Sequence, residues 1–140
     1  MPVAATGYAH VRITVTDIAR SRRFYDDVFG FPVAFEVPEG ADDATRAALG
    51  FLFGGVIYRL PGGQLLGLRP VAGPGDAFSE DRVGLDHLAL AVDGPQELEE
   101  AAAVLDGLGI AHEAVKDLGR AQILEFRDPD GVALELYATA

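Results

Sequence analysis

Apolar and polar residues alternate at the start of the first regular segment of the chain. Val11, Ile13 and Val15 are apolar, and the residues that separate and flank them are polar: His10, Arg12, Thr14 and Thr16. A period of two predicts a half-buried β-strand over residues 10–16, with one face packed and the other polar.

The spacing then changes to that of an amphipathic helix. Asp17 is a typical N-cap residue, and the predicted helix runs to Phe29, where Gly30 is suited to a left-handed cap. The apolar stripe consists of Ile18, Phe24, Tyr25, Val28 and Phe29. A second strand is expected at residues 31–37. Residues 38–50 are polar and alanine-rich, which predicts a loop or a short helical turn. Segments 51–60 and 64–69, joined at Pro61-Gly62-Gly63, predict a hairpin.

The second half repeats this order. A strand is expected at residues 85–92, a helix at 95–108, a strand at 110–116, and a hairpin of segments 121–126 and 132–137. The hairpin turn, Asp128-Pro129-Asp130-Gly131, is a strong turn signal. His10 and His87 open the first strand of each copy. Because two copies of one unit can pair about a pseudo-twofold axis, these two histidines are candidates for one shared site.

The repeat sets the domain organisation. We expect an α+β fold in residues 1–140, with module one at 8–70, a proline- and glycine-rich linker at 71–82 and module two at 83–140. A chain of 140 residues can bury a sizeable core without a disulfide or a structural metal.

The amino-acid composition argues against several classes of function. The chain has no cysteine, which excludes cysteine-based metal clusters and a thiol nucleophile. Its net charge of −11 argues against nucleic acid. No apolar run approaches the ~20 residues that cross a bilayer, so we expect a soluble, cytoplasmic protein that does not bind membranes. The acidity has two explanations, solubility or attraction of a cationic ligand.

The chain resembles the vicinal oxygen chelate superfamily, which includes glyoxalase I, extradiol dioxygenases, fosfomycin-resistance transferases and bleomycin-binding proteins. The resemblance rests on the two strand-opening histidines and on the segments SRRFYDDVFGFPV, DHLALAV and FRDPDGVALELYA. It implies two tandem βαβββ modules whose sheets curl around a shared cavity. It also implies a homodimer, a small-molecule substrate, and a divalent metal ion held by the first and fourth strands of the modules.

Carried over to this sequence, the resemblance implies His10, His87 and Glu135 as metal ligands. Aligning Gly63 with Gly131 places Gly67 opposite Glu135, at the position where glyoxalase-like members carry a ligand. Glycine cannot bind a metal through a side chain. The remaining set of two histidines and one carboxylate is the pattern of extradiol dioxygenases and fosfomycin-type transferases.

Two imidazoles and one carboxylate suit Fe²⁺, Mn²⁺, Co²⁺, Ni²⁺ or Zn²⁺, and three protein ligands leave positions open for substrate or water. A glutamate within the apolar run 132–136 would be costly to bury without a cation or water. Arg12 shares the face of His10, and Tyr137 shares that of Glu135. Arg12 is a candidate for binding an anionic substrate group and Tyr137 for donating a proton; the alternatives are an ordinary salt bridge and a core aromatic. His112 is expected at the surface.

Two classes of function remain. The first is a metal-dependent enzyme with dioxygenase-like or lyase/isomerase-like chemistry on an oxygen-bearing substrate. The second is a metal-free protein that sequesters a cationic antibiotic or natural product, in line with the net acidity. A fosfomycin-type transferase would need a basic pocket for the phosphonate, and the chain has only 11 Lys and Arg residues.

Overall fold

A computed structural model describes residues 1–139, which divide after Gly75 into two compact units, unit 1 and unit 2. Each unit contains a four-stranded mixed sheet with the same topology, β1-β4-β3-β2 in unit 1 and β5-β8-β7-β6 in unit 2. In each, the first strand pairs in parallel with the fourth, and the remaining neighbours are antiparallel. The predicted fold of two tandem βαβββ modules is therefore confirmed.

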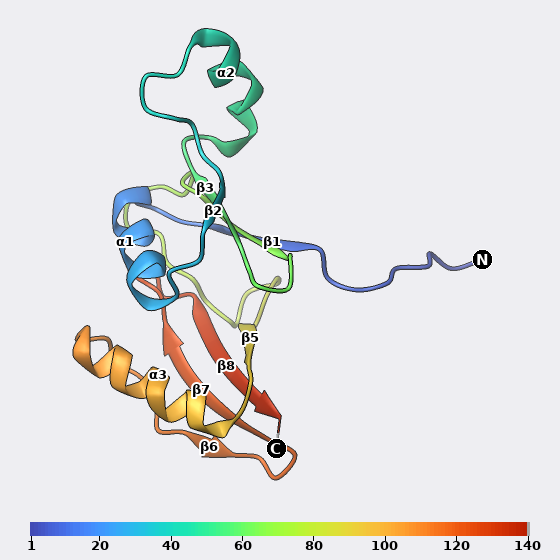
Figure 1. Cartoon of the computed structure of the whole chain (residues 1–140), viewed down its shortest axis with the longest axis vertical. Coiled ribbons are helices and arrows are strands. Elements are labelled where there is room, and N and C mark those ends of the chain that lie inside the picture. The colour runs from blue at the N-terminus through green and yellow to red at the C-terminus, as the bar shows by residue number, and fades with distance from the viewer. Residues whose placement is uncertain (140) are drawn as a thin grey trace. The chain divides into compact units, whose positions relative to one another are not determined.

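Unit 1 contains four short strands and three helical segments (Figure 1). Its elements are β1 His10–Thr14, α1 Ile18–Val28, β2 Val33–Phe35, α2 Asp43–Ala48, the 3-10 helix η1 Gly50–Leu52, β3 Val56–Arg59 and β4 Leu65–Arg69. The Asp17 side chain accepts a hydrogen bond from the Arg20 backbone at 3.1 Å, which confirms the predicted N-cap. Gly30 follows α1 with φ +61°, the left-handed conformation expected there.

The core of unit 1 lies between α1 and one face of its sheet. Its buried apolar residues are Ile13, Val15, Phe24, Tyr25, Leu52, Val56, Tyr58, Leu66 and Leu68. The Tyr58 hydroxyl donates to Asp26 Oδ1 at 2.8 Å and so ties β3 to α1. Burial, together with this bond, raises the pKa of Tyr58. The other face of the sheet carries the alternate residues of each strand.

Unit 2 consists of β5 Leu88–Val92, α3 Pro95–Gly107, β6 Lys116–Asp117, β7 Ala121–Arg127 and β8 Ala133–Thr139. Helix α3 lies along the sheet and contacts β5, β7 and β8 (Figure 1). The buried apolar residues are Leu98, Leu105, Ala121, Ile123, Leu124, Phe126, Val132, Leu134, Leu136 and Ala138. On β8 these alternate with Ala133, Glu135 and Tyr137, which share the other face.

Several predicted boundaries were wrong. Residues 51–55 are not strand, because residues 50–52 form η1 and Phe53 adopts a left-handed conformation with φ 52°. The strand expected at 110–116 is reduced to Lys116–Asp117 and an isolated bridge between His112 and Phe126. There the His112 ring bonds to Asp106 and to the Glu113 carbonyl, and such local bonds compete with a regular ladder. In residues 1–139, no helix has the length and apolar character needed to span a membrane.

Candidate functional site

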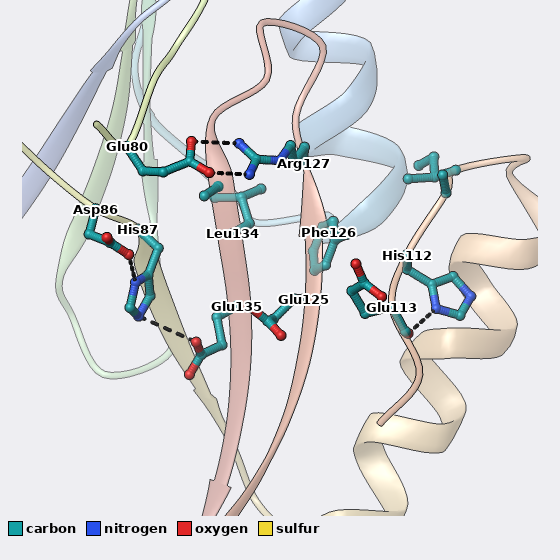
Figure 2. A pocket seen from close by; sticks show the side chains of 13 residues that line it. Glu80, Asp86, His87, His112, Glu113, Glu125, Phe126, Arg127, Leu134 and Glu135 are labelled. Carbon is teal, nitrogen blue, oxygen red and sulfur yellow. Dashed lines mark hydrogen bonds and ion pairs between the residues drawn. The ribbon is translucent and has the colours of Figure 1, made fainter. Parts of the chain in front are cut away.

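A cavity of about 540 Å³ lies in unit 2, on the face of the sheet that carries Glu135 (Figure 2). Its wall is formed by β7, β8, the residues that precede β5, and the segment between α3 and β6. The charged and imidazole side chains that line it are Glu80, Asp86, His87, His112, Glu113, Glu125, Arg127 and Glu135. Carboxylates outnumber cations on this wall, so a cation or a hydrogen-bond donor is the favoured occupant.

His87 immediately precedes β5 and bridges two carboxylates. Its Nδ1 lies 2.7 Å from Asp86 Oδ1, and its Nε2 lies 3.3 Å from Glu135 Oε2. The hydrogen bond to Asp86 raises the pKa of His87; burial opposes this, and the charge of Glu135 adds to it. When neutral, an Nδ1–H that donates to Asp86 leaves the Nε2 lone pair directed toward Glu135.

Glu135 is directly opposite Glu125 in the β7–β8 ladder. Like charges at directly opposed positions destabilise a sheet unless cations compensate them. Lys116 Nζ lies 2.6 Å from Glu125 Oε1 and compensates that carboxylate. The Glu135 side chain is only 12% exposed, and among the described residues its ion-pair partner is His87. Glu135 is thus a nearly buried acid with one titratable partner, a favourable position for a metal ion.

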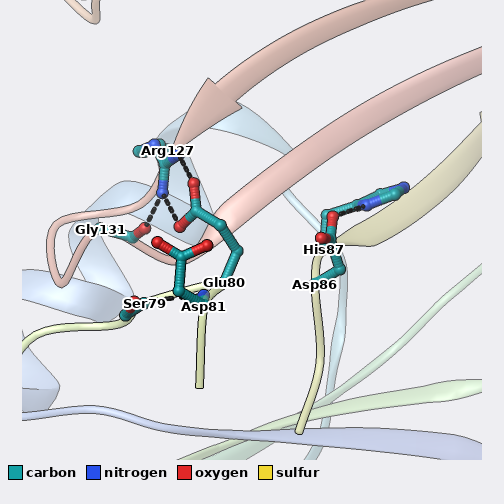
Figure 3. A network of polar contacts seen from close by, with 7 residues as sticks. All are labelled: Ser79, Glu80, Asp81, Asp86, His87, Arg127 and Gly131. Carbon is teal, nitrogen blue, oxygen red and sulfur yellow. Dashed lines mark hydrogen bonds and ion pairs between the residues drawn. The ribbon is translucent and has the colours of Figure 1, made fainter. Parts of the chain in front are cut away.

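A second ion pair fixes the segment before β5 to the sheet (Figure 3). Arg127 binds both carboxylate oxygens of Glu80, at 2.6 Å and 3.1 Å, and also donates to the Gly131 carbonyl at 2.9 Å. The hydrogen bonds from Arg127 lower the pKa of Glu80 to about 2. This bidentate pair attaches the chain six or seven residues ahead of Asp86 and His87, and so limits where these two side chains can lie.

His112, expected at the surface, is partly exposed, but it also lines the cavity, which was not predicted. Its side chain is 16% exposed and lines the cavity. Nε2 lies 2.7 Å from Asp106 Oδ1 at the end of α3, and Nδ1 lies 2.7 Å from the Glu113 carbonyl. These two hydrogen bonds, the one to Glu113 first, raise the pKa of His112. Because both ring nitrogens are engaged, His112 connects α3 to the sheet edge and has no free lone pair for a metal.

The structure brings together two of the three predicted ligands, His87 and Glu135. His10 is an exposed residue at the start of β1, in unit 1. Within residues 1–139, no three histidine, aspartate or glutamate side chains converge as a ready metal cage. Tyr137 lies on the same strand face as Glu135, two residues on, and does not line the cavity. Arg12 lies on β1, where its Nη2 donates to the Phe51 carbonyl at 2.5 Å rather than to a carboxylate.

The register confirms that Gly67 corresponds to Glu135. In unit 1 the residue two after His10, Arg12, pairs with Gly67. In unit 2 the residue two after His87, Ala89, pairs with Glu135.

Sequence reasoning missed Asp86, Glu125 and Glu113. Asp86 could have been found because it directly precedes the candidate ligand His87. Glu125 could have been found by counting back from the turn 128–131, which places it opposite Glu135. Nothing in the sequence marks Glu113, because it falls within the strand predicted at 110–116, most of which is irregular in the structure.

A family model described as the Glyoxalase/Bleomycin resistance protein/Dioxygenase superfamily matches residues 7–136. A curated relative, the uncharacterized protein YaeR of Escherichia coli strain K12, is 31% identical over 131 residues. That match covers 91% of this chain and 92% of YaeR.

Solved structures share the fold. A glyoxylase/bleomycin resistance protein/dioxygenase domain from Frankia is 29% identical with a TM-score of 0.77, covering 98% of this chain and 100% of that one. A mutant of the fosfomycin resistance protein FosX from Listeria monocytogenes, complexed with Mn(II) and a dihydroxypropylphosphonic acid, is 17% identical. Its TM-score is 0.72, and the match covers 98% of this chain and 95% of that chain. At this identity the likeness to FosX concerns the fold.

Proposed function

Because this chain belongs to the Glyoxalase/Bleomycin resistance protein/Dioxygenase superfamily, we propose that it is a small metal-dependent enzyme that binds an oxygen-bearing substrate on a divalent cation. His10, His87 and Glu135 are the proposed ligands. The observation that carries the proposal is the approach of His87 Nε2 to Glu135, at 3.3 Å, with Nδ1 bound by Asp86. A carboxylate behind a ligating imidazole is the usual arrangement at metal sites, since it fixes the tautomer and orients the ring.

The donor set fits Fe²⁺, Mn²⁺, Co²⁺, Ni²⁺ or Zn²⁺. Such an ion polarises a bound oxygen and lowers the cost of developing negative charge on the substrate. The chain's own residues hold the ligands in place. Asp86 orients His87, and the Glu80–Arg127 pair attaches the segment that carries both. Tyr137 is the proposed proton donor on the Glu135 face, two residues along β8.

The raised pKa of His87 makes metal binding a competition with a proton. Binding must displace the proton that His87 shares with Asp86 and Glu135, so affinity should rise with pH through the imidazole titration and then level off. The FosX complex with Mn(II) supports the proposal to the extent that this fold can hold a divalent cation.

Metal analysis tests the proposal. Protein purified without chelator is assayed for bound metal, and the apoprotein is titrated calorimetrically with Mn²⁺, Ni²⁺, Zn²⁺ and anaerobic Fe²⁺. We expect His10→Ala, His87→Ala and Glu135→Gln each to weaken binding strongly. His112→Ala is the matched control, because it removes a cavity imidazole that is already doubly bonded. No binding by the wild type, or equal binding by Glu135→Gln and the control, would refute the metal site.

A second candidate function is favoured by the acidic cavity wall. Glu135, Glu113 and Asp86 line the cavity without an arginine or lysine partner among the described residues, and the net charge is −11. A metal-free protein that sequesters an organic cation would use this charge directly. Titration with bleomycin-like cations at low and high salt separates the two functions. Sequestration would be favoured if EDTA-treated protein bound such a cation tightly and in a salt-sensitive way, if Glu135→Gln abolished this binding, and if the wild type bound no metal.

We further propose that the protein acts as a homodimer in the cytoplasm. The superfamily resemblance supports the dimer, and the lack of cysteine is compatible with a reducing compartment. Sedimentation equilibrium tests the dimer. Mixing His10→Ala with Glu135→Gln protein then shows whether the ligands come from one chain or two. Recovery of metal binding in the mixture means that they come from two.

A further inference from the structure

The sheet of unit 1 has one face that is strongly basic, in contrast to the acidic wall of the unit 2 cavity. Strand alternation and the ladder register place the following residues on this face, hereafter the arginine face: His10, Arg12, Thr14, Phe35, Ile57, Arg59, Leu65, Gly67 and Arg69. No aspartate or glutamate occurs in β1, β2, β3 or β4. Three of the eleven basic residues of the chain therefore lie on one sheet without a carboxylate.

These arginines take part in no salt bridge with any residue in the range 1–139, although acidic residues outnumber basic ones by 22 to 11 in the chain. By contrast, Arg22, Lys116 and Arg127 each have a carboxylate within 2.6 Å. Cations left unpaired in so acidic a protein are available for an external anion.

Gly67 makes room for the Arg12 side chain. A Cβ placed on Gly67 would lie 2.8 Å from Arg12 Cγ and 3.3 Å from Ile57 Cγ1, so Arg12 crosses the neighbouring strand directly over the glycine. At the corresponding place in unit 2, small Ala89 lies opposite Glu135. The two modules thus differ at one equivalent cross-strand pair: unit 2 has Glu135 opposite a small residue, and unit 1 has Arg12 opposite a glycine.

Only some of the N–H groups of the Arg12 guanidinium have hydrogen-bond partners. Nη2 donates to the Phe51 carbonyl at 2.5 Å, but buried Nε has no acceptor within residues 1–139. A buried N–H without a partner is costly, and a charged one more so. Nη1 is not among these buried atoms and is open to an external anion, which would stabilise the guanidinium through a charge-assisted hydrogen bond.

Exposed phenylalanines lie beside two of these arginines, Arg12 and Arg69. Phe53 is 55% exposed, and its ring centroid lies 4.4 Å from Arg69 Cζ. Phe51 is 47% exposed, lies 6.0 Å from Arg12 Cζ, and contacts Phe35 edge-to-face at 6.4 Å. Phe53 is also the one non-glycine residue with positive φ among the described residues, a conformation that costs about 1–2 kcal/mol for an L-residue. Strain that presents an aromatic ring at the surface is typical of a binding site.

We propose that the arginine face, with Phe51 and Phe53, binds the carboxylate of an aromatic acid. Arg12 donates from Nη1 to the carboxylate, Arg69 adds a second positive charge, and the phenylalanines pack against the flat apolar body of the acid. The inference rests on the proposed function only in taking this aromatic acid as the substrate. Binding to the face itself requires no metal.

Ligand titration of metal-free protein tests the proposal. The chain has no tryptophan, so the fluorescence of 2-naphthoate can be followed without interference, with EDTA present. We expect 2-naphthoate to bind at least tenfold more tightly than neutral 2-naphthamide, because only the acid forms a charge-assisted hydrogen bond with the arginines. Equal affinity for the acid and the amide would overturn the proposal. Because metal binding is measured separately, a failure here is distinguishable from a failure of the metal site.

Variants locate the binding site on the arginine face. Arg12→Met should weaken 2-naphthoate binding about tenfold or more, and Arg69→Met should weaken it severalfold. The matched control is Arg23→Met, since Arg23 is an exposed arginine on α1 in the same unit. Equal affinities of Arg12→Met and the control would overturn the assignment.

Gly67→Ala keeps the charge but displaces Arg12, and should also weaken binding. Circular dichroism checks that the variants are folded. If Arg12→Met and Arg69→Met instead change the oligomeric state while 2-naphthoate binds no form, the face is a contact between copies and the proposal is wrong.

Discussion

The proposed role of Asp86 gives the sharpest quantitative prediction. Asp86→Asn removes the carboxylate that accepts from His87 Nδ1 at 2.7 Å and leaves both proposed ligands of unit 2 in place. Loss of such a supporting carboxylate costs 10- to 100-fold in metal affinity, or about 1.4–2.7 kcal/mol. The Asp86 side chain is 78% exposed and that of His87 43%, so solvent screens the pair. We therefore expect the lower limit, about tenfold.

The size of this effect should depend on pH. Asp86 is the largest cause of the raised pKa of His87, so Asp86→Asn lowers that pKa and weakens the competing proton. Above the His87 titration there is no proton to displace, and the full loss of about tenfold appears. Below it, easier deprotonation offsets part of the loss, so the affinities of the variant and the wild type should converge.

Competition against a chromophoric chelator, at several pH values, measures these affinities. Asp93→Asn is the matched control, because Asp93 is an exposed aspartate directly after β5 and its substitution removes the same charge from unit 2. The control should stay within about twofold of the wild type, as expected for a screened surface charge. If Asp86→Asn behaves like Asp93→Asn at high pH, Asp86 does not support a ligand and the proposed role of His87 is wrong.

Three further predictions concern the structure around the site. Leu124→Ala should lower the free energy of unfolding by about 2–5 kcal/mol, because the Leu124 side chain is fully buried. The control is Leu118→Ala at an exposed leucine, which should change this free energy by less than about 0.5 kcal/mol. Chemical denaturation measures both variants. The pKa of His112 is raised above 6.5, so its stabilising contribution is complete below pH 6.5 and is lost as pH rises through the raised value. Thermal unfolding should thus show the gap between wild type and His112→Gln narrowing with rising pH, and a constant gap would contradict the assignment. Carbon NMR should show the Glu80 carboxylate titrating near pH 2, and its contribution to the stability of the fold should be lost as pH falls from 4.5 toward that value. A wild-type titration near pH 4.5 that Arg127→Gln leaves unchanged would show that the Glu80–Arg127 pair does not form.

Local sequence patterns determined the repeated topology. The alternation in β1, the cap at Asp17, the glycine after α1 and the turn 128–131 each depend on residues close together in the chain, and each was predicted correctly. Prediction failed in two segments that are apolar enough for strands. Residues 50–52 form a 3-10 turn in place of the strand expected from residue 51. In residues 110–115, the hydrogen bonds of the His112 side chain replace a regular strand ladder.

The duplication in the sequence made His10 and His87 candidates for one site, and the family resemblance implied Glu135 as their partner and Gly67 as its counterpart in the first module. The observed register agrees with the pairing of Gly67 and Glu135 as counterparts. Only the tertiary structure decided how these residues are used. It placed Glu125 opposite Glu135, set Asp86 behind His87, engaged both nitrogens of His112, and laid Arg12 over Gly67. The physical reason is that charge, burial and hydrogen-bond partners depend on contacts across strands. A one-dimensional pattern specifies faces but not which side chains meet on them.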